Sequence, residues 1–184
     1  SPLGMAGVKT ISYELAQQCE QPPDHVFVPA GGGGLSLAVA LGFQECAARG
    51  ILRKIPRVEI VQPQGNDTIA TPLREGRDRA CEVNCTSKIS GLQVPNVIDG
   101  TESLRQARAT GGTGHRVSDE AVWNMQKRLA REEGIFCEPA AATALAGTIQ
   151  AAKRGEIHPD ARIVALITGN GFKDPSSIPR LLTN

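Results

Sequence analysis

The chain has 184 residues, 40% of them hydrophobic and 21% charged, which is typical of a soluble globular protein and predicts a single domain over residues 1–184. Its net charge of +1 and its pI near 7.6, with lysines and arginines scattered along the chain, argue against a nucleic-acid-binding surface. No apolar run approaches the roughly 18 residues of a membrane span, and the N-terminus lacks the pattern of a signal peptide, so we expect a cytoplasmic protein that binds a small molecule.

The first fifty residues alternate between helical and strand patterns. Residues 10–19 place apolar side chains at helical spacing, which predicts a helix that ends before a pair of prolines. Residues 26–28 predict a short buried strand, and residues 35–49 predict a helix that ends at Gly50. This alternation indicates an α/β layer architecture.

Four consecutive glycines, Gly31, Gly32, Gly33 and Gly34, connect that strand to that helix. Such a turn presents unpaired amides and the positive end of the helix dipole, so a phosphate can lie directly on the amides of these glycines and of Leu35. The alternative is a tight or flexible turn that needs positive φ angles, although one glycine is normally enough for that. The common nucleotide motifs G-x-x-x-x-G-K-[ST] and G-x-G-x-x-G are absent, so the glycines predict a phosphate site without naming its ligand.

The middle of the chain continues the pattern. Residues 57–62 predict a second strand. Residues 63–100 are irregular and too long for a plain connection, so we expect an active-site loop with a short helix there. Residues 101–110 predict a helix with Thr101 as its N-cap.

The last third predicts two strands and two helices. Residues 115–117 predict a third strand, and Ser118 then caps a helix that ends at Gly134. An alanine-rich helix follows over residues 139–153. The most apolar run, residues 163–167, predicts a central strand.

A second glycine-containing turn, TGNGFKD at residues 168–174, follows this last strand. Ligands of open parallel sheets gather beyond the carboxyl ends of the strands. We therefore expect this turn and the glycine turn at residues 31–34 to face the same crevice.

The motifs and their order resemble the C-terminal part of the fold-type II pyridoxal phosphate enzymes, and most closely the threonine synthases. The similar segments are SPLGMAGVKTISYEL at the start of the chain, VPAGGGGL, VSDEAV, GIFCEPAAATALAG and TGNGFKD. Each segment is weakly specific alone, but together they cover nearly the whole chain in the family's order. The resemblance implies a three-layer α/β fold, in which a mostly parallel twisted sheet carries helices on both faces.

The resemblance also implies a cofactor, pyridoxal 5'-phosphate, and residues that hold it. The amides of Gly31–Leu35 would bind its phosphate, and the Thr168 hydroxyl would contact its pyridine nitrogen, which favours β- and γ-chemistry over other reactions. Thr168 could instead bond its own turn. Glu138 lies where the family places a residue near the cofactor, but it could equally be a carboxylate at a helix start.

The chain departs from the family pattern at several positions. Ala6 stands where the family has Glu, and Phe172 where it has Leu. The lysine that holds the cofactor as a Schiff base lies in an S-x-K-[DR] motif, which this chain does not contain. Of the six lysines only Lys173 imitates that motif, and its position matches the other motif, TGNGFKD; Lys88 fits less well. We therefore predict no catalytic residue in this chain.

These features predict the C-terminal portion of a threonine-synthase-like enzyme whose N-terminal half is absent. The parent reaction would convert O-phosphohomoserine to threonine and phosphate, and the chain alone would be inactive. An exposed sheet edge would associate with another copy or with the missing segment. Alternatives are a serine or threonine dehydratase, a cysteine-synthase-like enzyme, or a non-catalytic module that binds a phosphorylated metabolite.

Cysteines and histidines give no further site. Five cysteines without a C-x-x-C pair indicate reduced thiols, and a metal held by Cys81 and Cys85 is disfavoured because no histidine or second cysteine pair is nearby. His25, His115 and His158 show no metal-ligand spacing, so we assign them no role.

Overall fold

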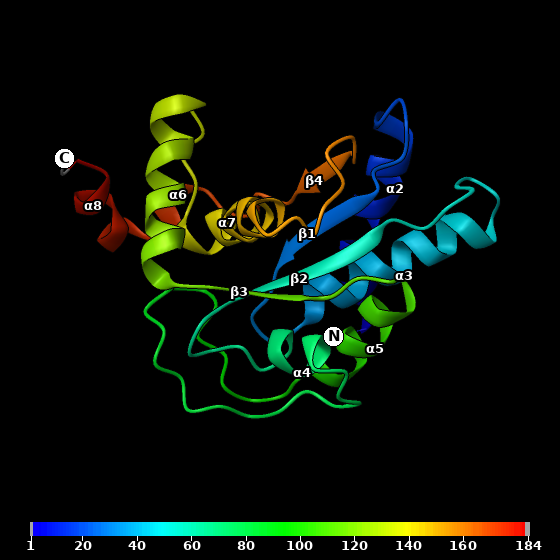
Figure 1. Cartoon of the computed structure of the whole chain (residues 1–184), viewed down its shortest axis with the longest axis horizontal. Coiled ribbons are helices and arrows are strands. Elements are labelled where there is room, and N and C mark those ends of the chain that lie inside the picture. Colours follow the sequence, from blue (N-terminus) through cyan, green and yellow to red (C-terminus); the bar gives the residue numbers. More distant parts are fainter. Residues whose placement is uncertain (1, 183–184) are drawn as a thin grey trace.

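Four parallel strands form the centre of the computed structural model, which describes residues 2–182 (Figure 1). The elements in chain order are α1 (Pro2–Val8), α2 (Thr10–Gln18), β1 (His25–Pro29), α3 (Gly34–Ala48), β2 (Arg57–Pro63), α4 (Ala70–Arg74), α5 (Gly100–Ala109), β3 (Gly114–Val117), α6 (Asp119–Glu132), α7 (Pro139–Lys153), β4 (Ile163–Ala165), the 3-10 turns η1 (Gly171–Lys173) and η2 (Pro175–Ser177), and α8 (Ile178–Leu182).

The sheet order is β3-β2-β1-β4, with every pair parallel. β1 and β2 are therefore the central strands. The prediction that residues 163–167 form a central strand is wrong, because β4 covers only Ile163–Ala165 and, within residues 2–182, pairs with β1 alone. An apolar run shows that a strand is suited to burial, but it does not show how many neighbours the strand has. Ile163 and Ile167 are 37% and 36% exposed.

Side chains of the strands alternate between two helical layers, as the pleat requires. Phe27 and Val61 face the cluster formed with α6 and α7, whereas Val26 and Val58 face α3, and Ile60 packs with α4 and α5. Figure 1 shows α6 and α7 on one side of the sheet and α3, α4 and α5 on the other. This arrangement confirms the predicted α/β fold with helices on both faces.

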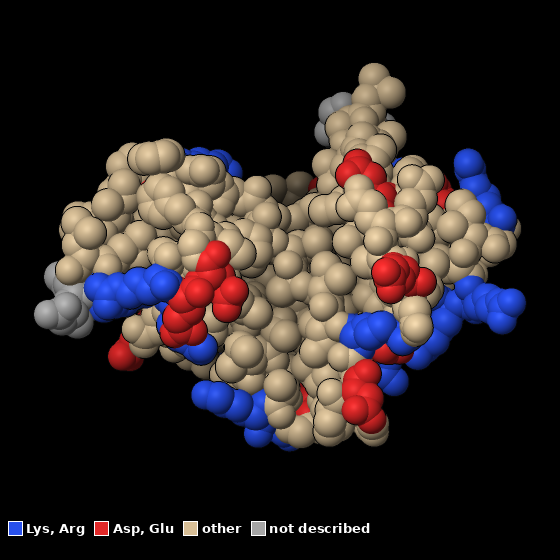
Figure 2. All heavy atoms as spheres, turned by 90° about the horizontal axis from the view of Figure 1, so that it is seen from above, with Lys and Arg blue, Asp and Glu red and all other residues tan. Residues whose placement is uncertain are grey.

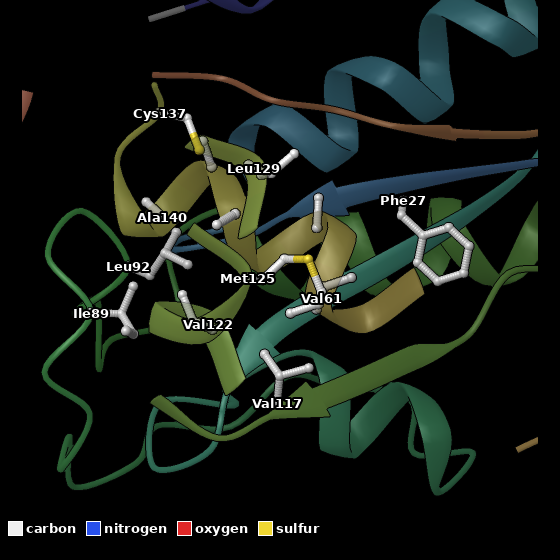
Figure 3. Packing of buried hydrophobic residues seen from close by; sticks show 14 of the residues in the cluster. Phe27, Val61, Ile89, Leu92, Val117, Val122, Met125, Leu129, Cys137 and Ala140 are labelled. Atoms are coloured by element: carbon white, nitrogen blue, oxygen red, sulfur yellow. The ribbon is translucent and has the colours of Figure 1, made fainter. Parts of the chain in front are cut away.

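The core is built mostly of small and aliphatic side chains, and aromatic residues make up only 3% of the chain. Six alanines of α7 are buried, and a Cβ on Gly147 of the same helix would come within 2.5 Å of Val61. The helix can therefore lie close against β2. Figure 3 shows the surrounding cluster, to which α6 contributes Met125 and Val122 and the long loop contributes Ile89.

The predicted capping residues have different outcomes. Ser118 caps α6 as predicted, since its hydroxyl accepts a hydrogen bond from the Ala121 amide at 3.2 Å. The prediction for Thr101 is wrong, because α5 begins at Gly100 and Asp99 is the residue before it. The helix starts earlier because the Asp99 carbonyl already accepts from the Ser103 amide at 2.9 Å.

The segment between β2 and α5 is irregular apart from α4, as predicted, and buried side chains hold it in place. The Gln62 side-chain oxygen accepts from the amides of Ile69 and Ala70 at 2.7 and 2.8 Å. The Asn66 amide group donates to the Leu92 carbonyl at 2.6 Å. The loop is therefore anchored at both ends of its course past the carboxyl edge of the sheet.

The surface in Figure 2 carries Lys and Arg side chains interspersed with Asp and Glu, with a broad uncharged area between its two ends. Among the helices of residues 2–182, none combines the length and the apolar character needed to cross a membrane.

Candidate functional site

The two glycine-containing turns leave the sheet at the same edge. β1 ends at Pro29, one residue before the turn at residues 31–34, and β4 ends at Ala165, shortly before Thr168. β1 and β4 are parallel neighbours, and the Leu166 amide continues their pairing by donating to the Phe27 carbonyl at 3.0 Å. The carboxyl ends of both strands therefore point the same way, and the turns lie side by side beyond them.

The glycine turn presents main-chain amides at the start of a long helix. Within residues 2–182, no oxygen accepts a hydrogen bond from the amides of residues 31–36, and Gly33 caps α3 without a side-chain bond. The N-terminal end of the 15-residue helix α3 adds a partial positive charge at the same place. The turn thus combines donors and field in the way that an anion requires.

Packing against α5 fixes the shape of this turn. Gly33 has a φ of 95°, in the left-handed region, and a Cβ there would come within 3.1 Å of Gly100 and of Ser103. The Ser36 hydroxyl donates to the Gly33 carbonyl at 3.1 Å and lies 2.7 Å from the Ser103 hydroxyl. At this position, glycine is required by both its backbone angle and its close neighbours.

A carboxylate lies beside the turn. The Asp99 amide donates to the Gly32 carbonyl at 3.0 Å, and its side-chain oxygen lies 3.3 Å from the place that a Cβ on Gly34 would take. Asp99 therefore shares the field of the α3 N-terminus with any anion on the turn. The sequence analysis missed this residue, since a lone aspartate 65 positions beyond Gly34 gives no local signal.

The second turn presents a free hydroxyl. Thr168 is exposed, and its hydroxyl has no hydrogen-bond partner among residues 2–182, so the alternative in which it bonds its own turn is not what the structure shows. The neighbouring Gly169 is held in place, because its carbonyl accepts from the Glu138 amide at 3.0 Å. The Asn170 side chain accepts from the Phe172 amide at 2.9 Å.

Glu138 lies at the start of α7 with its side chain buried against Gly169, where a Cβ would meet its carboxylate at 2.0 Å. The same carboxylate pairs with the Lys173 ammonium at 3.4 Å. Both interpretations of Glu138 thus remain compatible with its position, since it stands at a helix start and also supports the turn that carries Thr168. Lys173 is 69% exposed and is paired with this carboxylate.

The residues present fit a phosphate-bearing ring. The amides of residues 31–36 offer donors that nothing else in residues 2–182 uses, and the free Thr168 hydroxyl stands at the neighbouring strand end. Within residues 2–182, neither turn contains an unpaired lysine, because Lys173 is paired with Glu138. Within the same residues, no three His, Cys, Asp or Glu side chains are grouped to hold a metal ion.

Comparison with known proteins gives a family match over most of the chain. The family model described as pyridoxal-phosphate dependent enzyme matches residues 1–169. The chain is 35% identical over 182 residues to the threonine synthase of Methanocaldococcus jannaschii, covering 98% of this chain and 45% of that protein. It is 33% identical over 180 residues to the threonine synthase of Methanosarcina acetivorans, covering 97% of this chain and 44% of that protein. The chain thus spans less than half the length of these relatives.

Solved structures agree on the fold. The processed form of threonine deaminase isoform 2 from Solanum lycopersicum aligns with a TM-score of 0.78 at 24% identity, over 99% of this chain and 50% of that one. A fungal L-serine ammonia-lyase from Rhizomucor miehei aligns with a TM-score of 0.74 at 24% identity, over 90% of this chain and 51% of that one.

Proposed function

Because this chain belongs to the family of pyridoxal-phosphate dependent enzymes, we propose that it is the cofactor-binding portion of a threonine-synthase-like enzyme, formed by residues 1–184 as one domain. The observation that carries the proposal is the pair of turns at the carboxyl ends of β1 and β4, one with free amides and one with a free hydroxyl.

In this proposal, one turn binds the phosphate of the cofactor and the other contacts its pyridine ring. The amides of Gly31, Gly32, Gly33, Gly34 and Leu35 bind the phosphate, aided by the dipole of α3. Thr168 offers its hydroxyl to the pyridine nitrogen. When bound, pyridoxal phosphate supplies an electron sink for carbanion chemistry, and a neutral hydroxyl leaves that sink weaker than a carboxylate partner would.

Catalysis requires a lysine that this chain does not supply. The amine that holds the cofactor covalently also moves the α-proton of the substrate, and neither amides nor a threonine hydroxyl can do so. None of the six lysines stands in an S-x-K-[DR] motif. We therefore expect this polypeptide alone to bind cofactor without converting O-phosphohomoserine to threonine and phosphate.

We place association with further polypeptide at the outer edge of β4. Within residues 2–182 this strand has one paired side, and Ile163 and Ile167 beside it are more than one-third exposed. The occupant we favour is a segment that carries the lysine, because the curated relatives are more than twice as long as the region they share with this chain. The alternative occupant is a second copy of this chain, and a sedimentation experiment distinguishes the two. The free cysteines fit a reducing, cytoplasmic location.

The test is a titration with pyridoxal phosphate followed by borohydride reduction. We expect reversible binding, seen by absorbance and removed by dialysis, and no stoichiometric covalent adduct by mass spectrometry. Phosphate release from O-phosphohomoserine should stay at background. A stoichiometric adduct on Lys173 would overturn the assignment, and a failure to bind the cofactor at all would remove the proposed site.

Other reactions within the same family remain the second candidate. The structural neighbours include a threonine deaminase and a serine ammonia-lyase, so L-threonine and L-serine are assayed for conversion to keto acids beside O-phosphohomoserine. Activity on them, once the lysine-bearing segment is added, favours a dehydratase. A non-catalytic binding module predicts reversible binding and no turnover under any of these conditions.

A further inference from the structure

Two histidines that sequence spacing left without a role, His25 and His115, share a partner near the amino edge of the sheet, opposite the two turns. His25 begins β1 and His115 lies in β3, while His158 follows α7. His25 and His115 are 7% and 2% exposed. Sequence spacing could not show this arrangement, because a buried residue of β2, and not chain distance, joins the histidines of β1 and β3.

A buried glutamate joins the two inner histidines. Glu59 of β2 is 3% exposed, and its two oxygens lie 2.8 Å from His25 Nδ1 and 3.1 Å from His115 Nε2. The Thr113 amide donates to it at 2.8 Å. Burial raises the pKa of Glu59, but the hydrogen bonds from His115 and Thr113 outweigh this effect, so the pKa lies below its usual value. The carboxylate is thus charged, and both rings donate to it.

His25 has a second ring nitrogen that this network does not use. The ring lines a cavity of about 320 Å³ at the amino edge of the sheet, a volume at the lower end of the range for small-ligand sites. Its Nδ1 is bonded to Glu59, and its Nε2 has no hydrogen-bond partner among residues 2–182. A ring this deeply buried with one free nitrogen at a cavity wall is a ready ligand contact.

Arg57 supplies an unpaired cation beside His25. The two residues are direct partners in the parallel pairing of β1 and β2, so their side chains emerge on the same face. Arg57 lines the same cavity and forms no ion pair within residues 2–182. A guanidinium with free donors next to an imidazole matches the two oxygens of a carboxylate.

The remaining charged groups at the cavity are acidic or already paired. Asp24 is bonded to Lys54 at 3.4 Å and to the Arg162 amide at 3.0 Å. Glu156 is paired with Arg74 at 2.5 Å, and Asp160 has only His158 nearby, at 3.8 Å. These carboxylates line the wall of the cavity together with Arg57. Among these carboxylates only Asp160 has no Lys or Arg partner within residues 2–182, and its charge favours a ligand that also carries a positive charge over a dianion.

We propose that this cavity binds a small zwitterion of the α-amino-acid class, with its carboxylate between Arg57 and His25 and its ammonium group toward Asp160. The site is separate from the proposed cofactor site, because His25 starts the strand whose other end leads to the glycine turn. It neither requires the cofactor nor depends on the reaction that the whole enzyme performs.

The test uses the three histidines as reporters in NMR spectra of the full chain without added cofactor. Glycine, acetate, methylammonium and inorganic phosphate are titrated at one constant pH. We expect glycine to shift the His25 ring signals saturably, with a dissociation constant of roughly millimolar size for so small a ligand. Acetate should bind more weakly, and methylammonium and phosphate should not saturate.

Variants locate the effect. Arg57→Gln should weaken glycine binding about tenfold or more, because a charge-assisted contact is lost. Arg53→Gln makes the same charge change at an exposed position that does not line the cavity, and it should leave glycine binding unchanged. The proposal is overturned if glycine leaves the His25 signals unshifted, if Arg57→Gln binds glycine normally, or if phosphate binds more tightly than glycine.

Discussion

The two edges of the sheet use different parts of the polypeptide to handle charge. At the carboxyl edge, the main-chain amides of residues 31–36 and the Thr168 hydroxyl have no hydrogen-bond partner within residues 2–182, and neither changes its charge with pH. At the amino edge, the ionisable side chains of His25, Glu59 and His115 are buried against one another. The difference shows that an anion-binding site can be made from main-chain amides and a helix dipole alone. The charge at the opposite edge depends instead on the protonation of side chains.

The largest effect on stability should come from a substitution in the glycine turn. Gly33→Ala must adopt a φ of 95° and also place a Cβ 3.1 Å from Gly100. We expect a loss of about 3 kcal/mol in the free energy of unfolding, from the left-handed backbone and from overpacking together. Urea unfolding measures it.

Gly50→Ala is the matched control for that change. Gly50 has a φ of 73°, but a Cβ there meets nothing within 4 Å. The substitution should cost only the conformational part, about 1–2 kcal/mol. Equal losses at the two positions would show that the close packing below the glycine turn is not what makes glycine necessary there.

The second effect tests the protonation-dependent edge. Glu59 has a lowered pKa, so it contributes stability above its unfolded pKa, and that contribution is lost as pH falls through the lowered folded value. We expect the free energy of unfolding to decline on the acid side of the ordinary glutamate range. Glu59→Gln should remove this part of the pH dependence and should lower stability at neutral pH by about 2 kcal/mol, because the buried hydrogen-bonded network is broken.

Glu132→Gln controls for the loss of a carboxylate. The pKa of Glu132 is also lowered, by the hydrogen bond from Arg128, but both groups are about half exposed. Its removal should leave the unfolding free energy nearly unchanged, because exposed ion pairs contribute little to stability. If both variants showed the same pH profile, the buried bridge would not be the source of the acid sensitivity.

The third effect separates cofactor affinity from stability. The Thr168 hydroxyl bonds nothing within residues 2–182, so Thr168→Val should leave the unfolding midpoint unchanged while weakening pyridoxal phosphate binding by about fivefold, the value of one neutral hydrogen bond. Thr110→Val should do the opposite, because the Thr110 hydroxyl accepts from the Val58 amide at 2.9 Å and donates to the Ala107 carbonyl at 2.6 Å. Absorbance titration and thermal melting distinguish the two.

The sequence predicts local features well and long-range ones poorly. The glycine turn and the Ser118 cap follow from neighbouring residues, and the structure has both elements where the pattern expects them. The edge position of β4 and the bridge from His25 to Glu59 depend on which strands pair, which periodicity does not encode. Asp99 was missed for the same reason, because it meets the glycine turn only through the folded loop.

The smallest predicted effect concerns Asp99, a carboxylate that lies beside the glycine turn. Its oxygen lies close to the start of α3, where it interacts favourably with the helix dipole and repels a second anion. Asp99→Asn should therefore lower stability by about 0.3–1 kcal/mol and should raise the affinity for pyridoxal phosphate about two- to fivefold. Both changes should shrink in high salt, because the interaction is electrostatic and close to the surface.

Asp78→Asn, at a side chain that is 94% exposed, makes the same charge change away from the turn and should alter neither quantity. An unchanged affinity in Asp99→Asn would mean that the phosphate does not lie on the amides at the start of α3. The carboxyl edge of the sheet would then no longer be an anion site made of main-chain amides.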